Sequence, residues 1–296
     1  MNETNQPDLK AVEKIYESVR TLEGGGFYVR RPFPTRELDR FDPFLLLDEG
    51  GPMEYCPGEA KGAPDHPHRG FETLTYILEG DMYSRDSSGF SAVLHPGDVE
   101  WTTAGSGIVH GSYPTEEALE KGGRVHVFQI WVNLPASKKM IPPQSKGVPA
   151  SSVPIAKSTD GKVTAKVIAG SAMGVTGPVA TTTPSIYVLY ALEPGADTTL
   201  SIPDGFNALA YVVAGEGAFG SEAKHATYGQ MVAFSTFGSN IQIKNDSSNK
   251  LEVLVLAGLK LNEPVARYGP FVMNTKEEIL EAFNDYHAGK FGEVAA

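Results

Sequence analysis

The sequence predicts an all-β protein made of two jelly-roll β-barrel domains in tandem, with short helices that include one at the C-terminus. Short β-like runs separated by glycine, proline and aspartate fill residues 27–131 and resume over residues 163–259, without alternating helices. Between them, residues 136–154 are rich in proline, serine and lysine, as is typical of a linker. We therefore expect an N-terminal barrel over residues 1–140 and a C-terminal barrel with its helix over residues 150–296.

Individual elements follow from local patterns. The first 22 residues carry apolar side chains at a helical spacing, which Gly24 to Gly26 end. Near the C-terminus, Thr275 and Glu278 have the spacing of a capping box, and the residues after them form an apolar stripe, so a helix is expected there. Six strands are expected in the second barrel, at residues 163–169, 186–192, 208–214, 230–234, 241–244 and 251–259.

The stretch from Asp65 to Gly80 carries the strongest functional signal. His66 and His68 are one residue apart, and side chains at this spacing share one face of a strand. A strand that continues to residue 79 also places Glu72 on this face, which is apolar from Leu74 onward and is expected to border the core. Two imidazoles and a carboxylate there indicate a divalent-metal site, because burying such groups is costly without a shared cation.

A third candidate ligand, His110, follows two turns in the sequence. Residues 96–98 read Pro-Gly-Asp, which is a turn signal, and the glycines within 105–107 mark a second bend before the short β-like run that contains His110. A hairpin of this kind is expected to bring His110 beside His66 and His68. The histidine pair, the carboxylate, the turn and the later histidine together resemble the two motifs of the cupin superfamily.

The match is closer to the pirin family than to cupins in general. The resemblance covers residues 20–290, and the run His-Pro-His-Arg-Gly-Phe-Glu-Thr is specific to that family. It implies a bicupin, in which only the N-terminal of two β-barrel domains holds iron or another divalent metal ion. The segments that resemble pirin motifs are His66–Thr73, Pro96–Gly105, Gly107–His110, Trp131–Pro135, Glu263–Ala266 and Gly269–Thr275.

By position, the resemblance places the family's three histidine ligands at His66, His68 and His110. Pirins usually have a glutamate ligand two residues after the third histidine, and this chain has Ser112 there. A serine hydroxyl is a poor neutral ligand for a divalent ion, so the departure affects metal affinity and activity. Two alternatives follow: either Glu72 or water completes the coordination sphere, or the site is weak or empty in the isolated protein.

The other histidines carry no ligand signal of comparable strength. His95, His225 and His287 are interpreted as core or surface residues. His126 is in phase with Phe128 and is a candidate to support the site from inside the barrel rather than to bind the metal. The second half has no His-x-His pair before its matching Gly-Glu-Gly segment, so the C-terminal barrel is expected to lack metal ligands.

The resemblance also implies a function. Several pirins are described as quercetin 2,3-dioxygenases, which add dioxygen across C2 and C4 of a flavonol and release carbon monoxide. The implied cofactor is one divalent metal ion, Fe²⁺ in the first place, with nickel, manganese, cobalt, copper or zinc as alternatives. The implied partners are dioxygen and a small aromatic substrate that chelates through oxygen, such as a flavonol. Glu72 would then be the base for the 3-hydroxyl proton or the alternative ligand.

A second function of another class stays open at this point. Other pirins act as metal- and redox-responsive partners of transcription factors or metabolic enzymes, without established turnover. Ser112 favours this alternative, because a weakened site harms turnover more than it harms shape. A metal-free bicupin scaffold is a third alternative, and the residues alone do not rank the three.

Composition sets the remaining limits. The net charge of −11 over 296 residues disfavours direct binding of nucleic acid, which relies on clustered lysine and arginine. The single cysteine, Cys56, excludes an intramolecular disulfide and suits a reducing compartment. No apolar run reaches the length of a membrane span, and the first residues lack the features of a secretory signal. We expect a cytoplasmic monomer, also nuclear if the source is eukaryotic.

Overall fold

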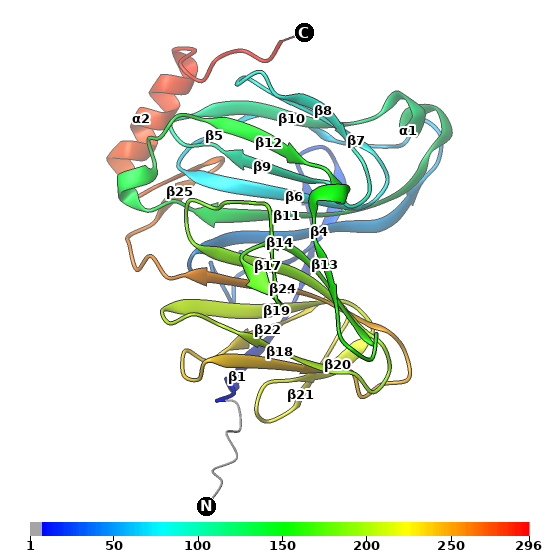
Figure 1. The fold of residues 1–296 in the computed structure, drawn as a ribbon. Coiled ribbons are helices and arrows are strands. Elements are labelled where there is room, and N and C mark those ends of the chain that lie inside the picture. Colours follow the sequence, from blue (N-terminus) through cyan, green and yellow to red (C-terminus); the bar gives the residue numbers. More distant parts are fainter. Residues whose placement is uncertain (1–7, 296) are drawn as a thin grey trace, which may run out of the picture. The chain divides into compact units, whose positions relative to one another are not determined.

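The computed structural model describes residues 8–295, which divide into two compact units. The first unit contains residues 19–152 and 261–295, and the second contains residues 8–18 and 153–260. Strands dominate both units, as the arrows in Figure 1 show. The predicted all-β fold with two domains and a C-terminal helix is therefore confirmed. Among the described residues, no helix is long and apolar enough to cross a membrane.

The first unit contains two antiparallel sheets. The seven-stranded sheet has the order β12-β9-β6-β11-β4-β3-β2, with β2 (Val19–Glu23), β3 (Phe27–Phe33), β4 (Phe44–Tyr55), β6 (Phe71–Glu79), β9 (Val99–Thr103), β11 (Gly123–Asn133) and β12 (Gln144–Val148). The four-stranded sheet has the order β5-β10-β7-β8, with β5 (Ala63–His68), β7 (Met82–Asp86), β8 (Ser91–Leu94) and β10 (Ile108–Pro114). Two packed sheets of this kind form a jelly roll.

Contacts between the two sheets identify their inner faces. The ring of His68 on β5 contacts the rings of Phe71 on β6 and Trp131 on β11. The Ser84 hydroxyl on β7 donates a 2.8 Å hydrogen bond to the carboxylate of Glu100 on β9. Side chains alternate along a strand, so the neighbours of these residues on the large sheet face away from the small sheet.

Shorter elements complete the first unit. A helix, α1 (Glu116–Lys121), precedes β11, and two 3₁₀ turns, Ala136–Lys138 and Ala150–Ser152, flank β12. After residue 261 the chain forms a small hairpin and the C-terminal helix, namely β25 (Ala266–Tyr268), β26 (Phe271–Met273) and α2 (Lys276–His287). The predicted capping box is present, because the side chains of Thr275 and Glu278 each accept from the other's backbone N–H.

The second unit also contains a larger and a smaller antiparallel sheet, and its core is more apolar. Its main sheet has the order β1-β22-β19-β24-β17-β14-β13, with β1 (Val12–Glu17), β13 (Ile155–Lys157), β14 (Val163–Ala169), β17 (Ser185–Leu192), β19 (Phe206–Ala214), β22 (Gln230–Phe234) and β24 (Leu251–Leu259). Its smaller sheets contain β18 (Asp197–Ser201), β20 (Glu216–Phe219), β21 (Lys224–Thr227) and β23 (Asn240–Lys244), and the pair β15 (Ser171–Ala172) and β16 (Val175–Thr176). All six strands expected from the sequence are present.

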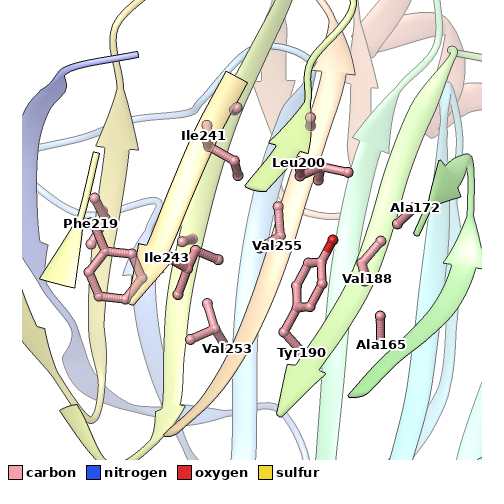
Figure 2. Packing of buried hydrophobic residues seen from close by; sticks show 14 of the residues in the cluster. Ala165, Ala172, Val188, Tyr190, Leu200, Phe219, Ile241, Ile243, Val253 and Val255 are labelled. Carbon is pink, nitrogen blue, oxygen red and sulfur yellow. The ribbon is translucent and has the colours of Figure 1, made fainter. Parts of the chain in front are cut away.

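Apolar side chains fill the space between the sheets of the second unit (Figure 2). Val188 and Tyr190 on β17, and Val253 and Val255 on β24, project into this cluster with Phe219 from β20. Among the described residues, no group of histidine, cysteine and acidic side chains that could hold a metal ion occurs in this unit. Its interior is a packed hydrophobic core.

Three expectations about the chain ends and the linker differ from the structure. A helix was expected over the first 22 residues, of which residues 1–7 lie outside the described part. The described part forms β1 and the start of β2 instead, because β1 pairs with β22 and β2 pairs with β3. The expected linker contains β12, which pairs with β9. The C-terminal helix belongs to the first unit rather than to the second barrel, and β1 belongs to the second unit.

Candidate metal centre

Two neighbouring strands of the small sheet carry the three histidines. β5 and β10 are antiparallel, and their register places His110 directly opposite His66. His68 follows on the same face of β5, opposite Ile108. The expected closeness of His110 to His66 and His68 is present, but it comes from the pairing of β5 with β10 and not from a hairpin, since β9 and β10 lie in different sheets.

The ring nitrogens of these histidines converge on one point. The Nε2 atom of His66 lies 3.1 Å from Nε2 of His68 and 3.1 Å from Nε2 of His110. The candidate ligand atoms of all three lie within 4.8 Å of one another. His68 and His110 are buried and His66 is half-buried, so the cluster lies at the edge of the barrel interior.

Hydrogen bonds to backbone carbonyls orient two of the rings. Nδ1 of His66 lies 2.7 Å from the carbonyl oxygen of Pro64, and Nδ1 of His68 lies 3.1 Å from that of Pro270. A carbonyl oxygen can only accept, so each Nδ1 must carry the proton and donate. Both Nε2 atoms are then left with a free lone pair directed at the cluster, which is the form that binds a metal ion.

The environment also keeps the cluster uncharged. Burial lowers the pKa of His66, lowers that of His68 well below its usual range, and lowers that of His110 to about 3; the neighbouring imidazoles add to the effect for His68 and His110. At neutral pH the rings are therefore neutral, with nitrogen lone pairs about 3 Å apart that repel one another. A shared divalent cation removes this repulsion, so the three imidazoles fit a metal ion.

The expected strand from His66 to Glu79 is interrupted, and this changes the position of Glu72. Gly70 has φ of 89°, and a Cβ there would lie 2.0 Å from the carbonyl oxygen of Val272, so only glycine fits this bend. The chain leaves the small sheet at β5 and enters the large sheet at β6. The strand-phase reason for grouping Glu72 with the histidines is therefore wrong.

Glu72 is fully buried in the large sheet, where its Oε1 accepts a 2.8 Å hydrogen bond from Thr103. It follows Phe71, whose ring contacts His68, so its side chain points to the opposite face of β6. It is not part of the three-histidine group. Its predicted role as base or ligand stays a prediction that experiment must test.

Ser112 lies on β10 two residues after His110, so both side chains share one face of the strand. It is half-buried and lies opposite Ser84 of β7. The hydroxyl is thus placed on the ligand side of the sheet, but the chain offers no anionic oxygen at this position. His126, the candidate for a supporting role, instead lies 2.8 Å from Glu49 on β4.

Several residues that hold the site in place were not predicted. Arg69 is buried, and it donates to the carbonyl of Ser106 at 2.7 Å and to Asp285 of α2 at 2.8 Å. Lys139 is buried as well, and its ammonium donates to the carbonyls of Gly70 and Val272 and to the side chain of Asn133. Both cations tie the C-terminal segment to the bend that follows His68. In the sequence, the position of Arg69 within the motif His66–Thr73 was the one signal of this role.

An aromatic and basic wall lies beside His68. The ring of Trp131 lies 4.9 Å from that of His68, and the guanidinium of Arg267 lies 4.9 Å from the Trp131 ring centre. Arg267 also lines a cavity of about 210 Å³. The other residues that line it are Asp39, Arg40, Leu45 and Val265. This volume is below the roughly 300 Å³ at which typical ligand pockets begin, so it suits one ring or one polar group of a ligand.

Comparison with known proteins agrees with these features. The family model described as Pirin matches residues 26–132, and the one described as Pirin C-terminal cupin domain matches residues 187–292. A Pirin-like protein of Solanum lycopersicum is 42% identical over 270 residues, which are 91% of this chain and 89% of the relative. Pirin of Homo sapiens is 40% identical over 272 residues, with 91% and 90% covered.

A solved structure of quercetin 2,3-dioxygenase from Acinetobacter baumannii is also similar. It is 35% identical in sequence and superimposes with a TM-score of 0.89. The match covers 96% of this chain and 99% of that one. The resemblance therefore extends over both units and is not confined to the histidine motif.

Proposed function

This chain belongs to the pirin family, and from that premise we propose that it is a metal-dependent dioxygenase of the quercetin 2,3-dioxygenase type. Its substrate is then a flavonol or a similar aromatic molecule that chelates through oxygen, with dioxygen as co-substrate. The convergence of three neutral Nε2 atoms within hydrogen-bond distance carries the proposal. The similar dioxygenase from Acinetobacter baumannii supports the reaction class.

His66, His68 and His110 would hold one divalent ion, for which we propose Fe²⁺. An ion with three imidazole ligands has open positions for a chelating oxygen and for dioxygen, so it supplies the site where the two reactants meet. Imidazole also suits nickel, copper and zinc, so the donor set does not choose among them.

The protein's own residues would position the substrate. Phe71 and Trp131 cover one side of His68 with aromatic surface, which excludes water from that side. Arg267 contacts the Trp131 ring and also lines the small cavity, where its guanidinium can donate hydrogen bonds to an oxygen-rich ring. These residues favour a planar molecule with several oxygen atoms, which describes a flavonol.

The decisive experiment is aerobic turnover of quercetin by protein of measured metal content. Loss of the flavonol's visible absorbance should require dioxygen and should be accompanied by release of carbon monoxide, which separates enzymatic cleavage from autoxidation. His66→Ala is the control, because it removes one ligand and leaves the rest of the barrel. Metal-replete protein that is no faster than His66→Ala would reject the dioxygenase.

The base for the 3-hydroxyl proton is tested in the same assay. If Glu72 accepts this proton, Glu72→Gln should lower turnover sharply while metal content stays unchanged. Glu72 accepts a hydrogen bond from Thr103 and points to the face of β6 opposite Phe71, which contacts His68. Its carboxylate would therefore have to move before it could reach a substrate at the histidines. Unchanged turnover would remove Glu72 from the mechanism.

One observation favours a second candidate function. Ser112 stands where pirins usually have a glutamate ligand, and a weakened metal site harms turnover more than it harms shape. On this alternative the chain is a metal- and redox-responsive binding protein that regulates a transcription factor or metabolic enzyme. Metal-loaded protein without turnover above the His66→Ala control would support it.

A further inference from the structure

Three buried side-chain polar atoms beside the metal centre have no hydrogen-bond partner within the described chain, namely Nε1 of Trp131, Nδ1 of His110 and Oδ2 of Asp86. The last two belong to His110 and Asp86, which lie on facing strands. Both residues are buried, with exposed fractions of 3% each. A buried polar atom without a partner is costly, so each of these atoms calls for an explanation.

The strand register places these two residues directly opposite each other. Asp86 is the last residue of β7, and it pairs with His110 of β10. The backbone N–H of Asp86 donates to the carbonyl of Phe90 rather than to β10. The two residues therefore form a non-hydrogen-bonded pair, the type in which opposing side chains of antiparallel strands are closest.

The turn between β7 and β8 provides hydrogen-bond partners for only one of the two carboxylate oxygens of Asp86. Oδ1 accepts from the backbone N–H of Ser88 at 2.7 Å, from the Ser88 hydroxyl at 2.7 Å and from the backbone N–H of Phe90 at 3.2 Å. These bonds stabilise the turn and would be made equally well by the side-chain oxygen of asparagine. They give no reason for a second, charged oxygen at this buried position.

The other two histidines supply that reason. His66 and His68 each donate from Nδ1 to an oxygen acceptor, and His110 is the member of the group for which no such acceptor is present. We propose that one water bridges the two side chains, accepting from Nδ1–H of His110 and donating to Oδ2 of Asp86. Asp86 is then the positioning residue that fixes the His110 ring and leaves its Nε2 free for the metal.

A bridge fits the chemistry of both atoms. Nδ1–H needs an acceptor and a carboxylate oxygen needs a donor, and a buried water supplies both functions between groups that do not touch. Metal-bound histidines commonly donate their other N–H to a carboxylate, carbonyl or water, which increases the basicity of the ligating nitrogen. The carboxylate would also offset part of the ion's charge near a site that lacks a glutamate at position 112.

The test measures zinc affinity, by competition with a chelator, for wild type, Asp86→Asn and Ser88→Ala. Asp86→Asn keeps an oxygen for the turn, and its NH₂ group then takes the place of Oδ2. An NH₂ group cannot accept a hydrogen bond from the bridging water, so the water loses the acceptor that orients it. Zinc affinity should fall 10- to 100-fold, the range found when such supporting partners are lost. Ser88→Ala removes the hydrogen bond that the Ser88 hydroxyl donates to Oδ1 and leaves Oδ2 unchanged. The zinc affinity of this variant should stay within threefold of wild type. Equal affinities for wild type and Asp86→Asn, or equal losses in both variants, would overturn the proposal.

A second readout uses the wild-type protein and does not depend on the variant's folding. In zinc-loaded protein, nitrogen-15 NMR should show a His110 Nδ1–H that exchanges with solvent as slowly as those of His66 and His68, whose acceptors are known. Fast exchange of this proton alone in the wild type would overturn the proposal. The inference rests on the proposed metal site, but neither readout involves turnover. Failure of the dioxygenase assay therefore leaves it intact, and failure of zinc binding in the wild type rejects both.

Discussion

His66 on β5 lies directly opposite His110 on β10, and their Nε2 atoms are 3.1 Å apart. This register sets the geometry of the centre, because the pairing of two strands fixes both rings on one face. His68 joins them from the next position on the same face. The sheet therefore sets the backbone positions of all three residues, and the carbonyls of Pro64 and Pro270 orient the rings of His66 and His68.

The first prediction is that metal binding depends on this cluster. The double variant His66→Ala/His68→Ala leaves one imidazole and should retain no metal after purification, since one neutral ligand holds a divalent ion weakly. Metal content by mass spectrometry is the measurement. His95→Ala is the matched control, because this histidine is exposed and pairs with Asp81 on the surface. Stoichiometric metal in a folded double variant would disprove the assignment.

The second prediction concerns the missing carboxylate. Ser112→Glu should tighten zinc binding about tenfold or more, equivalent to about 1.4 kcal/mol, because an anionic oxygen is added on the face that carries His110. The prediction requires that Glu72 does not already fill this place, and Glu72 is not part of the three-histidine group. Ser112→Gln, which is similar in size but neutral, should give a much smaller gain. A titration in which both variants bind zinc no better than wild type would contradict the prediction.

The sequence predicted the parts of this molecule that depend on local patterns. The strands at residues 163–169, 230–234 and 251–259 have the expected bounds, and Thr275 caps α2 as expected. The two-residue periodicity of a strand was enough to predict that His66 and His68 share one face. Turn signals and family motifs together pointed to His110, although its strand pairs with β5 rather than forming the expected hairpin.

Features that depend on long-range pairing were not predictable in this way. The bend at Gly70 is imposed by the approach of Val272, which lies two hundred residues later, so strand phase alone misplaced Glu72. β1 has apolar positions that also suit a helix, and its pairing with β22 decides in favour of a strand. The acceptor for His68 is the backbone carbonyl of Pro270, and a carbonyl leaves no signal in a sequence.

The third prediction concerns the connection from the site to α2. Asp285→Asn should leave the buried Arg69 guanidinium without an anionic partner and should lower the free energy of unfolding by about 1–3 kcal/mol. Hydrogen exchange should become faster in residues 276–287, which form α2. Lys290→Met is the control, because it removes the exposed ion pair of Asp285 and should cost much less. Equal effects of the two variants would show that the buried pair has no special role.

The last prediction concerns Glu100, a carboxylate between the two sheets of the first unit. It is 2% exposed and accepts from Ser84, and burial, with a smaller contribution from Asp86, raises its pKa to about 7. An unfolded glutamate titrates near 4.3, so between these values the folded state binds more protons than the unfolded state. The free energy of unfolding should therefore fall as the pH rises from about 4.5 to 7, by at most about 3 kcal/mol from this group.

Glu100→Gln should remove this loss, because a neutral amide can still accept from Ser84. Urea unfolding of metal-free protein between pH 4.5 and 8 should show little difference between variant and wild type at the acidic end and a more stable variant above pH 7. Asp48, whose pKa burial raises to about 6, contributes equally to both proteins and cancels in the difference. Glu281→Gln, on the exposed side of α2, is the control and should follow the wild-type profile. Parallel profiles for Glu100→Gln and wild type would show that Glu100 is ionised in the folded protein at low pH, with a partner that stabilises its charge.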